Sequence, residues 1–91
     1  MRELQDLRNE IDAVDDALIA LLKQRLALSR EVAEYKAAKN LPVYDAAREQ
    51  AILDKAAAEC GGQKDAIQAV FSAVLDASRK EQQQWKEHRK S

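Results

Sequence analysis

The chain has 91 residues, 34% of them charged and 46% hydrophobic, and its formal net charge at pH 7 is -1. One small domain of this length buries a core only marginally, and the balanced charge argues against a nucleic-acid partner or an anionic membrane. The single cysteine, Cys60, and the single histidine, His88, exclude a disulfide framework and a structural zinc site, so we expect no metal and no cofactor. Because the sequence shows neither an export signal nor an apolar run of membrane-spanning length, we expect a cytoplasmic protein.

The first predicted helix is unusually long and covers about residues 4–39. Apolar residues recur along it at alternating spacings of three and four, as in a coiled coil, and one position of that series holds Arg25 instead. Pro42 follows the helix, and Asn40 is a suitable left-handed residue to end it. The apolar positions are Leu4, Leu7, Ile11, Val14, Leu18, Leu21, Leu28, Val32 and Tyr35.

This helix is too long for a compact chain of its size. About 36 helical residues extend roughly 54 Å, whereas a compact domain of 91 residues has a radius of gyration near 12 Å. The helix therefore overhangs its own domain, and its apolar stripe needs a second chain to cover it. We expect an intertwined homodimer, the simplest symmetric solution.

Two shorter helices follow. Asp45 is placed to cap a second helix over about residues 45–60, which ends at the Gly61-Gly62 break, and a third helix covers about residues 65–86. We therefore expect a single all-α domain, residues 1–91, with three helices per chain. The residues after the third helix form a polar tail that we expect to fray. The third helix turns five apolar residues inward: Ile67, Val70, Phe71, Val74 and Leu75.

Polar residues interrupt both apolar faces. Arg25 interrupts the first helix, and Ser78 and Gln82 continue the inward face of the third. Each has an ordinary explanation: Arg25 sets coiled-coil register or pairs with a carboxylate, Ser78 is merely small, and Gln82 marks where the helix emerges into solvent. A buried guanidinium nevertheless needs an anion, from the protein or from a ligand.

Other cations lie near the same faces. Lys36 is eleven residues after Arg25, about 20° from its azimuth and about 16 Å further along the axis, so the two side chains flank a shared space. Arg8 lies at the far end of the helix, where only a partner chain would bring it close to this space. Arg48 and Glu49 open the second helix, and by spacing alone they are ordinary solvated charges. The pattern predicts a small cationic pocket for a polyanion and does not identify the anion.

Four stretches together resemble the all-helical chorismate mutases. They are LRNEID and LLKQRLALSREVAEYK in the first helix, LPVYDAARE at the start of the second, and DASRKEQ in the third. The resemblance extends from about Leu4 to Gln82. It implies two intertwined chains with two identical sites, each completed by an arginine of the other subunit, and the site residues it implies are Arg8, Arg25, Lys36, Asp45, Arg48, Glu49, Ser78 and Gln82.

The resemblance also implies the chemistry. Chorismate, a small dianion, would rearrange to prephenate on the route to phenylalanine and tyrosine, so the chain would be an isomerase. Arg25 and the partner's Arg8 would grip the carboxylates, while Lys36 and Gln82 would stabilise the breaking ether bond.

Two alternatives stay open. One is an isochorismate-pyruvate lyase of the same fold, against which the acidic pair Asp45 and Glu49 argues. The other is a non-catalytic docking or regulatory module of a shikimate-pathway enzyme, and such an enzyme is also a possible partner of an active mutase.

Overall fold

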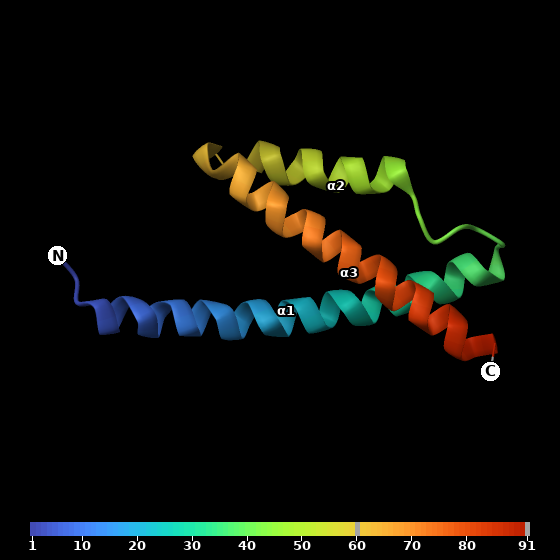
Figure 1. Cartoon of the computed structure of the whole chain (residues 1–91), viewed down its shortest axis with the longest axis horizontal. Coiled ribbons are helices and arrows are strands. Elements are labelled where there is room, and N and C mark those ends of the chain that lie inside the picture. Colours follow the sequence, from blue (N-terminus) through green and yellow to red (C-terminus); the bar gives the residue numbers. More distant parts are fainter. Residues whose placement is uncertain (60, 91) are drawn as a thin grey trace.

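The computed structural model describes residues 1–59 and 61–90, and within them it contains three α-helices and no strand. These are α1 (Leu4–Ala38), α2 (Ala46–Glu59) and α3 (Lys64–Lys90), with a short 3₁₀ turn, η1 (Gly61–Gln63), leading into α3 (Figure 1). The predicted all-α fold with one very long helix is confirmed. The predicted end of the second helix at residue 60 lies outside the described residues.

The long helix α1 is continuous over 35 residues, which corresponds to about 53 Å at 1.5 Å per residue. Its last residue is Ala38, and the predicted left-handed residue that terminates it is Asn40, whose φ is 55°. The Leu41 N–H donates to the Lys36 carbonyl at 2.8 Å and the Asn40 N–H to the Ala37 carbonyl at 3.3 Å. This pair of bonds is the Schellman arrangement, which satisfies the last carbonyls and turns the chain towards α2.

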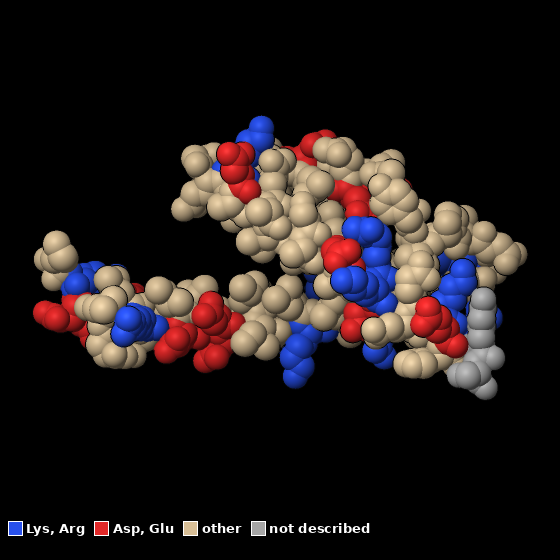
Figure 2. Space-filling model, viewed as in Figure 1, with Lys and Arg blue, Asp and Glu red and all other residues tan. Residues whose placement is uncertain are grey.

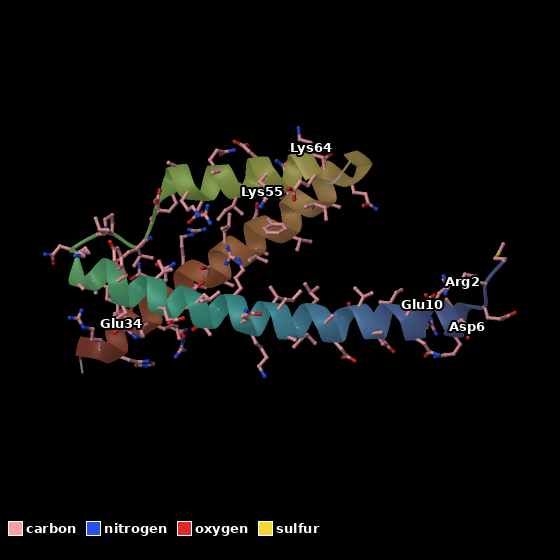
Figure 3. The ribbon with its side chains drawn as sticks, turned by 180° about the vertical axis from the view of Figure 1, so that it is seen from behind. Arg2, Asp6, Glu10, Glu34, Lys55 and Lys64 are labelled. Carbon is pink, nitrogen blue, oxygen red and sulfur yellow. The ribbon has the colours of Figure 1, made fainter. Side chains whose placement is uncertain are left out.

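The helix α3 packs against both other helices, whereas the first half of α1 projects away from them (Figure 1). Every residue from 1 to 21 is exposed, and the two buried residues of α1, Ser29 and Ala33, lie in its second half. The small core consists of Ala33, Val43 and Leu75. The side chains of Arg2, Asp6 and Glu10, labelled in Figure 3, lie at the free end of α1, where Arg2 pairs with Glu10.

The predicted overhang of α1 is confirmed by the dimensions of the chain. Its radius of gyration is 16.6 Å and its longest extent is 56 Å, against about 12 Å for a compact chain of this length. The apolar stripe of α1 lies in water in the single chain, with Ile11 57%, Val14 64% and Leu21 62% exposed. None of the helices in the described part of the chain is long and apolar enough to cross a membrane.

The third helix is longer than predicted. It begins at Lys64 and continues to Lys90, so the segment that we expected to fray after residue 86 is helical. Trp85 is partly covered, and the Arg89 guanidinium lies 5.6 Å from the centre of its ring, one turn further on. Residues 82–90 are mostly Gln, Lys, Glu and Arg around the ring of Trp85, and these residue types favour helix when such a contact is available.

Candidate functional site

A cavity of about 260 Å³ lies where α1, α2 and α3 meet the loop that joins α1 to α2. Lys and Arg side chains gather near the crossing of α3 and α1, as Figure 2 shows. Seven of the eight residues predicted for the site line this single cavity: Arg25, Lys36, Asp45, Arg48, Glu49, Ser78 and Gln82. The prediction that Arg25 and Lys36 flank a shared space agrees with this placement.

The helical periodicity explains why these side chains converge. On α1, Arg25, Ser29, Val32 and Lys36 follow one another at spacings of four, three and four, so all line the cavity from one face. On α3 the spacing from Leu75 through Ser78 to Gln82 does the same. The N-terminus of α2 completes the wall of the cavity. Asp45 caps this end of the helix as predicted, because its Oδ1 accepts the backbone N–H of Arg48 at 3.0 Å.

Two cations of the cavity have no counterion in the part of the protein that the structure describes. In residues 1–59 and 61–90, neither the Arg25 nor the Arg48 guanidinium forms an ion pair or a hydrogen bond, although both line the cavity and Arg25 is partly buried. By contrast, Arg30 outside the cavity pairs with Glu81 at 2.7 Å. Arg25 therefore does not pair with a carboxylate of the described residues, which leaves coiled-coil register or a ligand to explain it.

The ammonium of Lys36 is held at the rim of the cavity by the connecting loop. Its Nζ donates to the Val43 carbonyl at 2.8 Å, and Val43 is itself buried. An ammonium has three N–H donors, so this bond fixes its position and leaves two donors for a ligand.

The polar residues of α3 are core residues. Ser78 is 8% exposed and Gln82 7% exposed, so Gln82 does not mark an emergence of the helix into solvent. The Ser78 hydroxyl lies 2.6 Å from that of Ser29, and the Ser29 hydroxyl donates to the Arg25 carbonyl at 3.1 Å. Since a hydroxyl carries one hydrogen, Ser78 donates to Ser29 when Ser29 donates to Arg25.

The Gln82 amide has no hydrogen-bond partner among the described residues, and its Oε1 is completely buried. A buried amide without a partner costs free energy because it has lost water without replacement. Such a group is suited to a ligand that supplies the missing hydrogen bond.

Arg8 is the one predicted site residue that the single chain does not bring to the cavity. It is exposed on the projecting half of α1, seventeen residues before Arg25 and thus about 26 Å away along the axis. This distance agrees with the expectation that Arg8 would serve a different subunit from its own.

Sequence reasoning missed two polar residues that line the cavity, Ser29 and Arg79. Ser29 carried a signal, because it lies four residues after Arg25 on the same helical face. No such signal marks Arg79. Its Nε lies 3.0 Å from Oε2 of Glu49, and the spacing of residues within α3 does not reveal a partner on α2. Within the described ranges, no three His, Cys, Asp or Glu side chains come together as a metal site.

Comparison with known proteins shows that the chain matches a known protein family. The family model for chorismate mutase type II matches residues 7–83. A bifunctional chorismate mutase/prephenate dehydratase of Aquifex aeolicus is 40% identical over 55 residues, which are 60% of this chain and 15% of that protein. A 4-amino-4-deoxychorismate mutase of Streptomyces venezuelae is 36% identical over 55 residues, 60% of this chain and 53% of that protein.

A solved structure is also similar. It is a conserved hypothetical protein from Pyrococcus furiosus, with a TM-score of 0.73 and 34% identity, and the match covers 87% of this chain and 93% of that one. The chain spans only 15% and 53% of the two curated relatives, yet the family match covers all of α2, most of α1 and α3, and every lining residue of the cavity. The chain therefore belongs to the chorismate mutase type II family.

Proposed function

We propose that the chain is a chorismate mutase, an isomerase that rearranges chorismate to prephenate on the route to phenylalanine and tyrosine. One observation carries the proposal: the cavity between the three helices holds two guanidinium groups, Arg25 and Arg48, that have no carboxylate partner in the described residues. The substrate is a dianion, and its two carboxylates would supply the missing counterions. The bidentate geometry of arginine also restrains the direction of each carboxylate, which favours the compact reactive conformer.

The rearrangement breaks an ether C–O bond while a C–C bond forms, and it needs no nucleophile and no proton transfer. Negative charge grows on the ether oxygen as its bond lengthens. Fixed donors in a cavity from which water is excluded stabilise that charge most effectively. We assign this task to Lys36, whose ammonium donates to Val43 and keeps two further donors, and to Gln82, whose buried amide has no partner among the described residues.

The remaining cavity residues bind the substrate. Ser78 assists Arg25 and Arg48 at the carboxylates, while Asp45 and Glu49 lie on either side of the ring hydroxyl, which donates its one hydrogen to Glu49. The carboxylate of Asp45 already accepts one backbone N–H at 3.0 Å, so its orientation is set before the substrate arrives.

We further propose that two chains intertwine and that Arg8 of one completes the cavity of the other. The support is the exposed apolar stripe of α1, whose members include Leu4, Leu7, Ile11, Val14, Leu18 and Leu21, each at least 37% exposed in the single chain. Covering such side chains stabilises an assembly by roughly 1.5 kcal/mol or more for each one fully buried. An antiparallel partner helix would cover the stripe and carry its own Arg8 towards this cavity.

Two alternatives of the same fold have less support. An isochorismate-pyruvate lyase would bind a similar dianion, but Asp45 and Glu49 lining the cavity favour the mutase. A non-catalytic docking module would have no use for unpaired cations around a cavity. A shikimate-pathway partner stays a prediction, encouraged by the bifunctional chorismate mutase/prephenate dehydratase relative, and a cytoplasmic location stays a prediction from the sequence.

The relative named for 4-amino-4-deoxychorismate raises the choice between a ring hydroxyl and a ring amine. We propose that the hydroxyl compound, chorismate, is the preferred substrate. The direct test is to incubate the purified protein with chorismate and, separately, with isochorismate, and to identify the products by NMR. Prephenate from chorismate supports the mutase, whereas pyruvate and salicylate from isochorismate with no prephenate from chorismate would show the lyase.

A further inference from the structure

Arg79 is a cation of the cavity wall that the proposed mechanism does not use. Its Nε lies 3.0 Å from Oε2 of Glu49, and the Glu49 side chain is only 19% exposed. This is an ion pair between α3 and α2 directly at the cavity, because both residues line it. Glu49 is the carboxylate that we assign to the substrate hydroxyl, and the guanidinium of Arg79 offsets its negative charge at the cavity.

The guanidinium of Arg79 is fixed from several sides. Its carbon Cζ lies 5.6 Å from the centre of the Tyr44 ring, in the loop that leads into α2. Asp76 lies 3.7 Å away on α3, but the Lys80 ammonium holds that carboxylate more closely, at 3.0 Å, and its hydrogen bond lowers the pKa of Asp76. The closest carboxylate to Arg79 is therefore Glu49, and the ring of Tyr44 limits where the guanidinium can move.

We propose that Arg79 is a specificity-determining residue: it positions and neutralises Glu49, and so makes the cavity prefer a ring hydroxyl over a ring ammonium. The inference rests on the proposed function, in which Glu49 faces that hydroxyl. Arg79 acts through Glu49, so it is a positioning residue and not a catalytic one.

The charges of the two substituents explain the preference. A hydroxyl is neutral and donates one hydrogen bond to a carboxylate that is already paired, whereas an amine at this position is protonated near neutral pH. An unpaired Glu49 would attract that ammonium, but the charge of Arg79 both neutralises the carboxylate and repels a second cation beside it. The cavity then holds four cations, Arg25, Lys36, Arg48 and Arg79, against the two carboxylates of Asp45 and Glu49.

The test is the ratio of kcat/KM for 4-amino-4-deoxychorismate to kcat/KM for chorismate in the full-length chain. Replacing Arg79 with methionine (Arg79→Met) should raise this ratio about tenfold. A unit positive charge within about 6 Å of the substrate's ammonium repels it at least that strongly near a protein surface. A purely structural loss would lower both values together and leave the ratio unchanged. The matched control is Lys86→Met, which removes an exposed cation of α3 that does not line the cavity and forms no ion pair with the described residues, so it should leave the ratio as in the wild type.

Arg79→Gln is the second variant, since it also removes the charge but leaves a side chain that can still donate to Glu49. It should raise the ratio in the same direction, and it decides the question if Arg79→Met does not fold. Arg79→Lys, which keeps the charge, should leave the ratio close to that of the wild type. An unchanged ratio in the charge-removing variant that folds, or an equal rise in Lys86→Met, overturns the role of Arg79 alone. A wild-type chain that forms no prephenate overturns the proposed function and this inference with it.

Discussion

Replacing Arg25 with leucine separates the functional from the structural explanation of this residue. The substitution completes the apolar series of α1 between Leu21 and Leu28, and it removes a guanidinium that has no partner in the described residues. A series of this kind favours a leucine at that position, so we expect the variant to fold and associate at least as well as the wild type.

Its activity should fall steeply. If Arg25 grips one substrate carboxylate with two charge-assisted hydrogen bonds of about 1.5–3 kcal/mol each, the loss is about 3–6 kcal/mol, or roughly 10²–10⁴ in kcat/KM. Prephenate formation from chorismate gives the rate, while circular dichroism and sedimentation report the fold and the association. Arg30→Leu is the control, because Arg30 lies on the same helix but pairs with Glu81 outside the cavity, so its kcat/KM should stay within a few-fold of the wild type.

Two results would refute the reasoning about Arg25. If Arg25→Leu unfolds or fails to associate while Arg30→Leu does not, then Arg25 is chiefly structural. If Arg25→Leu keeps a near-wild-type kcat/KM, its guanidinium does not bind the substrate.

Three further predictions follow from the same account. Lys36→Ala should lower kcat about 10² to 10³ fold, the usual effect of losing a donor to transition-state charge, and a near-wild-type kcat in initial-rate assays would remove Lys36 from that role. Gln82→Glu should make kcat rise as the pH falls, because a carboxyl donates only when protonated, whereas the wild type should vary little around neutrality; flat pH–rate profiles for both proteins would argue against Gln82 as the donor. Leu18→Lys places a charge in the exposed stripe of α1, where Leu18 is 46% exposed in the single chain, and should yield a monomer with little activity; sedimentation equilibrium would contradict the proposed interface if this variant associates as the wild type does.

The sequence was sufficient for features with a local origin. The continuous α1, its end at Asn40 and the Asp45 cap of α2 all follow from spacing and from residues that act on their own segment. The common face of Arg25 and Lys36 also follows from helical geometry, because both lie on one element.

Features that depend on two elements were not predictable from spacing. The pair Glu49–Arg79 and the contact between Ser29 and Ser78 each join helices whose relative placement the pattern does not give. The end of α3 was placed too early because its polar composition suggested fraying, whereas the contact of Arg89 with the Trp85 ring supports the last turns. The position of Arg8 relative to a cavity depends on a second chain and stays a proposal.

Co-expressed chains that are each inactive test the central claim most directly, because the claim joins catalysis, the cavity and the partner's arginine. Arg8→Ala and Arg25→Ala homodimers should each be inactive. In a heterodimer, the chain with intact Arg25 would receive an intact Arg8 from its partner and form one complete site, so a random mixture should recover about a quarter of the wild-type activity. Recovery of prephenate formation near this level would support a site shared between two chains, whereas heterodimers that form without any recovery would contradict it.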